Sequence, residues 1–416
     1  MCAFYRKEVC IVGAGPGGTT AALSLARQGI DCVLADKAVF PRDKICGDAL
    51  SGKVVQLLGK LDPAILADLS SRAFQIGSSG VIFAAPNLRS LRVPFRNEKR
   101  QLDHPPGYLC RRVDFDNFLL EQTSRYPGIQ VLQGTEISSY RRENGEWILT
   151  TADGLTTIAA NLIILADGAH SHFARHHAAI RQEPAHYVAG LRAYYRNVRD
   201  LDKENFIELH FLKEFVPGYF WIFPLSGGMA NVGVGMRSDK VSARKMHLKR
   251  TMLEMISTCP SLKDRFRDAE LVGDIRGYGL PLGSKKRKIS GEGFMLIGDA
   301  GALIDPFTGE GIGNAMASAM AAVEVACKCI TARKFDARAT AEYDQLFYHR
   351  LWSELQLSYK MQRLGDHFPW LINLVVNKAS KNKALSEMIS CMFEDLDMRD
   401  RLKSPSFYFK LLSGRN

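Results

Sequence analysis

The chain has 416 residues, of which 46% are hydrophobic and 24% are charged. This length exceeds that of one minimal domain, and the composition is that of an ordinary globular protein, which excludes a disordered chain, a collagen-like fibre and a repeat array. The formal net charge of +11 favours an anionic ligand or an anionic membrane surface as a partner. No nucleic-acid-binding motif is found, so we expect no nucleic acid.

Segments that could anchor or cross-link the chain are missing from the sequence. No run approaches the roughly 18 consecutive apolar residues of a membrane span, and the apolar run at 9–12 leads directly into glycines, which is typical of a strand rather than a signal peptide. The nine cysteines include no Cys-x-x-Cys pair, which argues against a disulfide framework and a zinc site. We therefore expect a cytoplasmic protein without a metal, whose basic face is either solvated or weakly attracted to anionic lipid.

The first fifty residues predict a strand, a glycine-rich turn, a helix and a second strand. A short β-branched run at 8–12 leads into Gly-Ala-Gly-Pro-Gly-Gly at 13–18. Small and aliphatic residues follow at helical spacing over 19–28, and an apolar run over 31–36 ends in an aspartate. A GxGxxG match in this context indicates a dinucleotide-binding unit.

Each residue type in this pattern has a function in dinucleotide binding. Gly13 permits the tight turn, Gly15 lets the backbone approach a pyrophosphate, and Gly18 lets helix and sheet pack closely. The free N–H groups and the positive dipole end of the helix then face the diphosphate. Asp36 ends the second strand, where its carboxylate can accept both hydroxyls of an adenosine ribose. On this pattern alone the dinucleotide could be NAD or FAD.

A second segment rich in glycine and aspartate stands near residue 300. An apolar strand over 293–297 ends in Gly298 and Asp299, and a small-residue helix covers 315–326. Asp299 can accept a hydrogen bond from a ribityl hydroxyl. The N–H groups of residues 311–314 suit an anion or a polarised carbonyl, and would stabilise the negative charge of a reduced flavin.

A third segment lies between these two. Residues 162–166 form another apolar strand, which is closed by Asp167 and Gly168. Upstream of it, Arg112 begins a helix with the sequence Arg-Val-Asp-Phe-Asp.

The order of these motifs resembles the flavoprotein group that contains the p-hydroxybenzoate hydroxylase-like monooxygenases, the FAD halogenases and the geranylgeranyl reductases. The resemblance covers roughly residues 7–330 and implies that all three segments and the Arg-x-x-Phe-Asp helix start bind FAD. It assigns Arg112 to the flavin nucleotide, Asp167 to FAD or to the approach of a pyridine nucleotide, and Asp299 to the ribityl chain. The predicted FAD-binding residues are Gly13, Gly15, Pro16, Gly18, Asp36, Lys37, Arg42, Cys46, Gly47, Arg112, Asp167, Gly168, Gly298, Asp299, Pro306, Gly309, Gly311, Ile312 and Gly313.

Two further segments distinguish the branches of this group. A basic residue followed by Cys46-Gly47, just past the second strand, resembles the geranylgeranyl reductases, in which this loop lies against the isoalloxazine. The pattern Tyr219-x-Trp221-x-Phe223-Pro224, with Asn-Val-Gly-Val-Gly at 231–235, also resembles that family.

The three aromatic residues of that pattern alternate along a strand, so Tyr219, Trp221 and Phe223 project to one face. Such a wall suits a long apolar substrate above a flavin, although the same residues could simply fill the core of a sheet. Halogenases carry Trp-x-Trp-x-Ile-Pro instead, and the hydroxylases lack the aromatic wall. Both departures favour the reductase.

The resemblance implies reduction of isoprenoid C=C bonds in a prenylated lipid, quinone or diphosphate, with hydride from flavin N5 and a proton on the neighbouring carbon. Cys46, Tyr219 and Trp221 are the catalytic candidates, and Cys46 either donates the proton or only packs. Tyr219, Trp221, Phe223 and Pro224 are the predicted substrate-binding residues. Because no second strand-GxGxxG-helix unit exists for NAD(P)H, the electron donor is either NAD(P)H bound transiently or a small redox protein.

The fold class we expect is α/β: a Rossmann-like FAD-binding domain with an inserted antiparallel β-sheet substrate domain and C-terminal helices. A single amphipathic helix is expected at 241–259, and the helices after 335 are interrupted by Phe-Pro-Trp-Leu at 368–371. These last helices could cap the core, line a substrate entrance or rest on a membrane surface. The predicted boundaries are 1–74, 105–180 and 277–334 for the FAD-binding domain, 75–104 and 181–276 for the substrate domain, and 335–416 for the helical region.

Two other functions stay open on the sequence alone. One is a flavin-dependent monooxygenase or halogenase, and the other is a redox-silent protein that binds FAD and lipid without catalysis. The oligomeric state is also left open.

Overall fold

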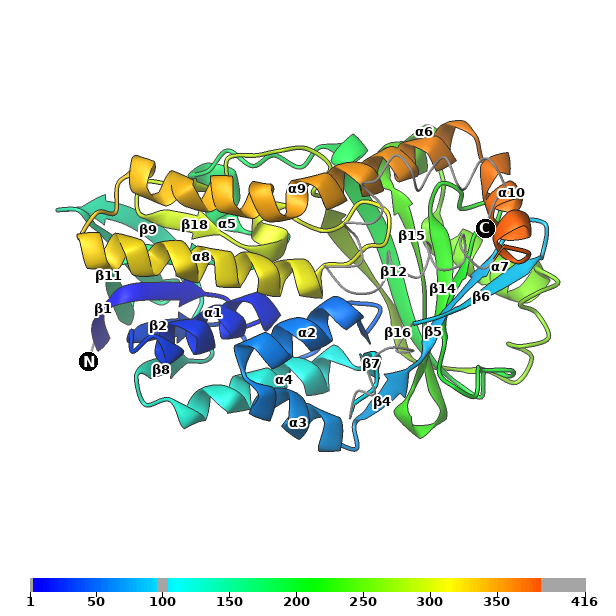
Figure 1. Ribbon diagram of the computed structural model, residues 1–416, viewed down its shortest axis with the longest axis horizontal. Coiled ribbons are helices and arrows are strands. Elements are labelled where there is room, and N and C mark those ends of the chain that lie inside the picture. The colour runs from blue at the N-terminus through cyan, green and yellow to red at the C-terminus, as the bar shows by residue number, and fades with distance from the viewer. Residues whose placement is uncertain (1–2, 96–103, 383–416) are drawn as a thin grey trace. The chain divides into compact units, whose positions relative to one another are not determined.

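The computed structural model describes residues 3–95 and 104–382 (Figure 1). The chain forms two compact units, each assembled from three separate stretches of sequence. The first unit contains Met1–Lys44, Arg112–His186 and Leu280–Tyr359. The second contains Ile45–Arg111, Tyr187–Gly279 and the residues from Lys360 on. Residues 45–74, which the sequence analysis assigns to the FAD-binding domain, thus lie in the second unit.

The first unit is built on an eight-stranded sheet in which the order of the main path is β17-β18-β11-β1-β2-β8. The pairs β1–β11, β1–β2, β2–β8 and β11–β18 are parallel, whereas β9, β10 and β11 pair antiparallel. Strands β1 and β11 end in runs of buried residues, as expected for parallel strands covered on both faces. Its strands are β1 (Ala3–Val12), β2 (Cys32–Ala35), β8 (Ile129–Leu132), β9 (Ile137–Glu143), β10 (Glu146–Thr151), β11 (Thr156–Leu165), β17 (Ser290–Gly291) and β18 (Phe294–Leu296).

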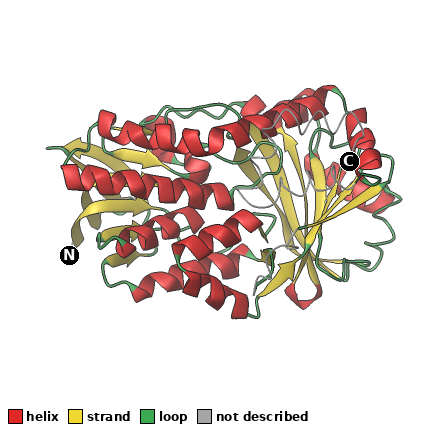
Figure 2. Cartoon of the chain, viewed as in Figure 1, coloured by secondary structure: helices red, strands yellow, loops and turns green. Residues whose placement is uncertain are grey.

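Helices connect and cover these strands, as Figure 2 shows by colour. Helix α1 begins at Pro16, a position where the fixed φ of proline suits a first helical turn, and it contacts α8. The helices of this unit are α1 (Pro16–Arg27), α4 (Arg112–Gln122), η1 (Thr123–Arg125), α5 (His172–His176), η2 (Pro184–His186), η4 (Gly298–Gly301), α8 (Ile312–Ala332) and most of α9 (Ala337–His367). The expected strand-turn-helix-strand order at the N-terminus is confirmed.

Helix α8 is long and apolar enough to cross a bilayer by length and composition alone, which the sequence analysis did not anticipate. Half of the relevant window is buried inside the protein. The core helix of a soluble protein has the same properties, so α8 is weak evidence for a membrane span.

The second unit contains a seven-stranded sheet with the order β16-β12-β15-β14-β13-β5-β6 and a three-stranded sheet with the order β3-β7-β4. In the large sheet the pairs β12–β15, β14–β15, β13–β14 and β5–β6 are antiparallel, and β13 pairs parallel to β5. Its strands are β5 (Gly80–Ala84), β6 (Ser90–Pro94), β12 (Tyr187–Arg196), β13 (Ile207–His210), β14 (Tyr219–Leu225), β15 (Met229–Arg237) and β16 (Glu270–Pro281). The small sheet consists of β3 (Ala49–Leu50), β4 (Gln75–Ser78) and β7 (Gly107–Cys110). The protein is therefore an α/β protein of the expected class.

One face of β14 packs into the core of this unit. Phe220 and Ile222 are fully buried there, together with Val232 and Val234 of the neighbouring strand β15. Because side chains alternate along a strand, Tyr219, Trp221 and Phe223 project from the opposite face.

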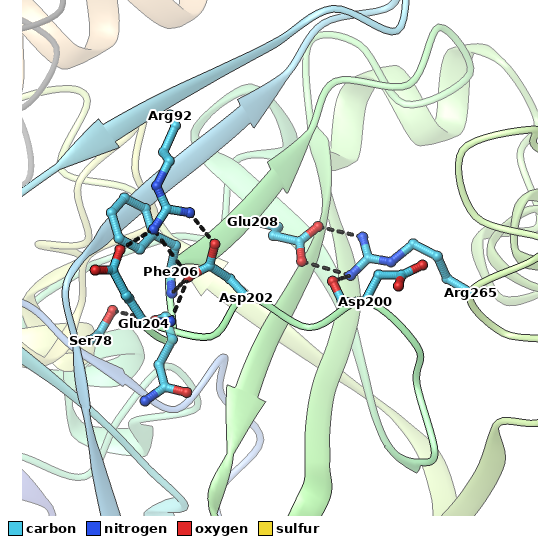
Figure 3. Close-up of polar contacts among 9 residues, drawn as sticks. Ser78, Arg92, Asp200, Asp202, Glu204, Phe206, Glu208 and Arg265 are labelled. Atoms are coloured by element: carbon cyan, nitrogen blue, oxygen red, sulfur yellow. Dashed lines mark hydrogen bonds and ion pairs between the residues drawn. The ribbon is translucent and has the colours of Figure 1, made fainter.

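Two groups of charged side chains also form ion pairs around β13 (Figure 3). The buried Glu208 accepts two hydrogen bonds from Arg265, at 2.5 and 2.7 Å, and one from His210. Burial alone would raise the pKa of Glu208, but these hydrogen bonds hold it below its ordinary value. Arg92 of β6 pairs with Asp202 and Glu204, which precede β13 in the chain. These ion pairs tie the strands to the segments around them.

The helices of the second unit differ from the sequence prediction at one place. The single helix expected at 241–259 is wrong, because the chain forms α6 and α7 separated by Lys245 with a left-handed φ of 49°. The side chain of Arg244 donates hydrogen bonds to the carbonyls of Glu214 and Val216, which fixes the break. The helices are α2 (Gly52–Leu61), α3 (Pro63–Ser71), η3 (Ser226–Gly228), α6 (Ser238–Ala243), α7 (Leu248–Thr258) and α10 (Trp370–Ala379).

The predicted interruption at 368–371 is confirmed, since α9 ends at His367 and α10 begins at Trp370. The helical region was predicted to extend to residue 416, but the part after residue 382 lies outside the described residues.

Candidate functional site

The glycine-rich turn after β1 is shaped by close backbone contacts. Gly13 has a φ of 101°, and a Cβ atom there would lie 2.5 Å from the carbonyl oxygen of Ala166, which directly follows β11. A Cβ atom on Gly18 would lie 1.8 Å from the carbonyl oxygen of Gly13. Only glycine fits at either position. The turn therefore brings the end of β1, the start of α1 and the end of β11 together.

Asp36 ties the end of β2 to this turn. One carboxylate oxygen accepts a hydrogen bond from the backbone N–H of Ala14 at 2.7 Å, and the other accepts one from Ala38 at 2.8 Å. Both oxygens keep further lone pairs, so the carboxylate is fixed in position and can still accept ribose hydroxyls.

Two guanidinium groups stand over the turn. A Cβ atom on Gly15 would lie 3.6 Å from Nη2 of Arg42 and 4.0 Å from Nη2 of Arg112. Both arginines bind the fully buried carboxylate of Asp116: Arg42 at 2.6 Å, and Arg112 through two contacts of 2.6 and 2.7 Å. One carboxylate thus positions two cations beside a glycine and a helix N-terminus, an arrangement that suits a diphosphate.

Asp167 follows β11 at the same edge of the sheet. Its Oδ1 atom is buried and has no hydrogen-bond partner among the described residues. Burial raises the pKa of Asp167 from 3.8 to about 6, although Ser171, Lys37 and Arg175 oppose this shift. A buried acceptor with a perturbed pKa marks a candidate ligand-binding position. Gly168 next to it has a φ of 83°.

The second Gly-Asp segment follows β18. Gly298 has a φ of 55°, its N–H donates to Oγ of Ser318 at 3.0 Å, and a Cβ atom there would lie 2.8 Å from that of Ala315. Asp299 comes next and lies 3.8 Å from Nζ of Lys44. The close packing of Gly298 against α8 fixes the adjacent carboxylate at the start of that helix.

The turn before α8 differs from the expectation in one respect. The buried Asp305 accepts the N–H groups of Phe307 and Thr308, which shapes the turn. The N–H of Gly313, which we expected to face an anion or a polarised carbonyl, donates instead to Oε1 of Glu310 at 2.7 Å. A side chain of this chain therefore already occupies that donor at the helix start.

The fold and these contacts define a dinucleotide-binding protein of the Rossmann type. The glycine cradle, the two guanidinium groups and the unpartnered oxygen of Asp167 fit the diphosphate and hydroxyl groups of FAD. Among the described residues, no group of three His, Cys, Asp or Glu side chains could hold a metal ion.

The chain belongs to the family of proteins with an FAD binding domain, whose model matches residues 6–331. It is 30% identical over 327 residues to the menaquinone reductase of Mycolicibacterium smegmatis, covering 77% of this chain and 76% of the relative. It is 28% identical over 404 residues to the digeranylgeranylglycerophospholipid reductase of Methanocaldococcus jannaschii, covering 95% of this chain and 94% of the relative.

Two solved structures share the fold. A geranylgeranyl bacteriochlorophyll reductase-like protein from Thermoplasma acidophilum has a TM-score of 0.78 and 24% identity, covering 96% of this chain and 99% of the other. The flavin-dependent brominase Bmp2 has a TM-score of 0.73 and 18% identity, covering 96% and 98%. At these identities the structures establish the fold and leave the chemistry to the residues.

In the second unit, Tyr219, Trp221 and Phe223 form a continuous aromatic face on β14. The ring centroids of Tyr219 and Trp221 are 6.3 Å apart, and those of Trp221 and Phe223 are 6.2 Å apart. Trp221 and Phe223 are only 9% and 8% exposed. Part of their cover comes from the loop at Gly47, where a Cβ atom would lie 3.0 Å from the ring of Phe223.

Glycine also determines how the indole lies. Trp221 pairs with Gly233 across β14 and β15, and a Cβ atom on Gly233 would lie 2.1 Å from the indole ring. The ring therefore covers the strand where a side chain would otherwise stand, which explains the glycine at position 233.

A buried hydrogen-bond network joins this face to the Cys46 loop. Asn231 accepts a hydrogen bond from Nε1 of Trp221 at 2.8 Å and donates to the carbonyl of Cys46 and to Asp48, each at 2.8 Å. Tyr194 donates to the same carboxylate oxygen of Asp48 at 2.7 Å. Asp48 is fully buried and has a left-handed φ of 67°. Asn231 thus fixes both the indole and the backbone of Cys46.

The first unit contains every predicted FAD-binding residue except Cys46 and Gly47, which belong to the second unit. All four predicted substrate-binding residues lie on β14. From the sequence, Asp116 was included only as the last residue of the Arg-x-x-Phe-Asp motif and was given no role of its own, although its four-residue spacing from Arg112 on a helix predicts a contact between the two. The roles of Asn231 and Asp48 were not predicted. For Asn231 the available signal was a polar residue next to the glycines of β15.

We predict that Asp116→Asn weakens FAD binding. By charge alone, removing a carboxylate near a diphosphate would tighten binding, but loss of the contacts that hold Arg42 and Arg112 should lower FAD affinity by about tenfold or more. Fluorescence titration of the flavin-free protein measures this. Asp114→Asn, which removes the same charge from the same helix, is the control. Tighter binding in Asp116→Asn would contradict the positioning role.

We predict that Asp167→Asn flattens the pH dependence of stability. A raised pKa means that the native state holds the proton more tightly than the unfolded chain, so the stabilising contribution of this group is full below about pH 4 and is lost as the pH rises through about 6. Between pH 4 and 7 the free energy of unfolding of the wild type should fall by about 1–2 kcal/mol relative to that of the variant. This figure is smaller than the full pKa shift would give, because solvent screens a partly exposed group. Denaturant unfolding of flavin-free protein at both pH values measures this difference, and parallel profiles would refute it.

We predict that Asn231→Ala lowers the free energy of unfolding by about 2 kcal/mol or more, because buried groups on Trp221, Cys46 and Asp48 lose a partner. Tryptophan fluorescence should change as the indole loses its fixed hydrogen bond. Asn117→Ala, on the surface of α4 with one contact to Glu121, should stay within about 0.5 kcal/mol of the wild type. Equal effects of the two substitutions would argue against the network.

Proposed function

We propose that the protein is an FAD-dependent reductase of isoprenoid C=C bonds in a prenylated lipid, quinone or diphosphate. The observation that carries this proposal is the aromatic face of Tyr219, Trp221 and Phe223, joined through Asn231 to the Cys46 loop. The names of the relatives support it, since a menaquinone and a digeranylgeranyl lipid both carry isoprenoid chains.

The chemistry divides between the cofactor and the chain. When bound, reduced FAD supplies hydride from N5 to one alkene carbon. The neighbouring carbon gains a proton, so that one C=C bond and one hydrogen pair give a saturated bond. NAD(P)H or a small redox protein would supply the two electrons, and NAD(P)H or solvent the proton, that restore the reduced cofactor.

The chain contributes orientation and exclusion of water. An unactivated alkene offers no polar group at the reacting carbons, so its position must come from apolar contact. Three aromatic rings in a row on one strand provide such contact for an extended hydrocarbon chain. Pro224 ends the predicted substrate-binding residues on the same strand.

Cys46 is the best candidate for the proton donor. Its thiol is partly buried, and its carbonyl is held by Asn231, so the loop is fixed beside a network that also holds Trp221. Tyr219 is half-buried and is the second candidate with an exchangeable proton. A cytoplasmic location stays a prediction.

Anaerobic single-turnover experiments test the function. Photoreduced protein should be reoxidised by a geranylgeranyl diphosphate, a geranylgeranylated glycerophospholipid or a menaquinol, whose ring is already reduced and cannot take up the flavin electrons. Mass spectrometry, after any quinol has been oxidised back to the quinone in air, should find products heavier by whole hydrogen pairs. A product that bears oxygen or halogen and forms only in air would support the monooxygenase or halogenase instead. No reoxidation by any of the three would favour a redox-silent protein.

We predict that Cys46→Ala retains flavin but slows reduction of the isoprenoid substrate by about 10²-fold or more, the usual contribution of a positioned acid. Stopped-flow absorbance of the flavin measures the rate, and the unchanged flavin spectrum shows that the cofactor stays bound. Cys259→Ala, which removes another partly buried thiol of the second unit, is the matched control. Unchanged turnover in Cys46→Ala would eliminate the thiol as proton donor.

A further inference from the structure

Large apolar side chains are unusually exposed around the junction of α9 and α10. Among the described residues, more than half of the exposed large apolar side chains gather in two segments, the stretch from Leu364 to Val375 and the turn between β5 and β6. Phe368 is 48% exposed, Trp370 is 59% exposed and Leu88, in the turn, is 57% exposed. Single exposed apolar residues are ordinary, but a contiguous group marks an interaction surface.

Hydrogen bonds show that the two segments are neighbours within the second unit. The backbone N–H of Asn87 donates to Oδ1 of Asn373 at 3.1 Å, and Arg89 donates to Asn377. Asn373 and Asn377 are four residues apart and form one row along α10. Leu88, between the two residues of the turn, is therefore fixed beside that helix.

The exposed row of α10 has the pattern of a helix that lies flat in an interface. Trp370, Leu374 and Lys378 follow one another at four-residue spacing and are all exposed. Val376 and Ala379 are buried on the other side. The apolar residues thus begin the row and a lysine ends it, as in helices that bury one face at the edge of a bilayer.

The backbone at Leu88 is a second, independent observation. Leu88 has a left-handed φ of 66° at an exposed turn. Glycine or asparagine adopts this conformation at lower cost, and with 57% of Leu88 exposed, burial within the chain offsets that cost only in part. A partner that covers the leucine would recover the remaining apolar burial.

The charges around this group select the partner. Arg89, Lys378 and Lys381 are exposed, and the sequences 85–95 and 360–382 contain a single carboxylate, that of Asp366. This carboxylate is 7% exposed and pairs with Arg237 at 3.4 Å and Lys240 at 2.8 Å. The surface therefore presents cations without an exposed carboxylate among these residues, which repels a second copy of itself and attracts anionic headgroups.

We propose that Leu88, Phe368, Trp370, Leu374 and Val375, with Arg89, Lys378 and Lys381, form a lipid-docking surface for an anionic bilayer. The apolar side chains enter the boundary between headgroups and acyl chains, and the cations contact the headgroups. This proposal goes beyond the reductase activity and does not depend on it, because docking needs neither flavin nor substrate.

Vesicle flotation of the holoprotein tests the surface. Vesicles of phosphatidylcholine with about a third phosphatidylglycerol should bind the protein, pure phosphatidylcholine should bind it about tenfold less, and added salt should weaken binding. Trp370→Ser should lower binding to the anionic vesicles by about tenfold. Lipids brominated on the acyl chain should quench Trp370, and this quenching should be lost in Trp370→Phe.

The substitution Leu88→Gly separates docking from folding. Glycine relieves the left-handed φ, so the melting temperature should stay the same or rise while vesicle binding falls several-fold. Leu155→Ser is the matched control, because Leu155 is also in a turn between strands and is 54% exposed. The proposal is overturned by equal binding to both kinds of vesicle, by an equal loss in Leu155→Ser, or by Trp370→Ser dissolving a dimer without changing vesicle binding. None of these results bears on the reductase assay.

Discussion

The first unit depends on the close approach of two parallel strands at their carboxyl ends. Gly13 leaves room for the carbonyl of Ala166 at a distance that no side chain would permit. Once β1 and β11 meet in this way, Asp167 follows at the same edge, Asp36 reaches the turn from β2, and Gly298 arrives from β18, which pairs with β11. A ligand that binds at the carboxyl ends of a parallel sheet therefore meets all of these groups together.

Electrostatics at this edge is arranged for a ligand at some cost to the protein alone. Asp116 is fully buried, and two guanidinium groups share its side chain. Asp167 lacks such a partner, and burial raises its pKa to about 6. The two carboxylates therefore differ in role: Asp116 positions the arginines of the site, whereas Asp167 has an oxygen available to a ligand. Such local conflicts with stability are expected where a protein binds rather than where it only packs.

The sequence indicated those parts of the site that depend on the identity of one residue. A left-handed turn or a close backbone contact requires glycine, so the roles of Gly13, Gly18 and Gly298 could be predicted from the sequence. The contacts of Asn231 could not be predicted, because they depend on which residues β14, β15 and the Cys46 loop bring side by side. The break between α6 and α7 at Lys245 was also not predicted, because the hydrophobic period continues across it. The carbonyls that bind the side chain of Arg244 lie about thirty residues away in the sequence. The sequence thus predicts local backbone conformation, whereas contacts between residues far apart in the chain need the structure.

The network around Asn231 constrains how the aromatic face and the Cys46 loop act. A single amide accepts from the indole of Trp221 and donates to the carbonyl of Cys46, so neither can move without disturbing the other. The absence of a side chain at Gly233 leaves the space that the indole fills while it keeps this hydrogen bond. The Cys46 loop and the aromatic face are therefore linked through one side chain. If the proposed function holds, a hydrocarbon chain against the aromatic face would meet a Cys46 backbone whose carbonyl is already hydrogen-bonded by Asn231. Such preorganisation is what reduction of an unactivated double bond would require.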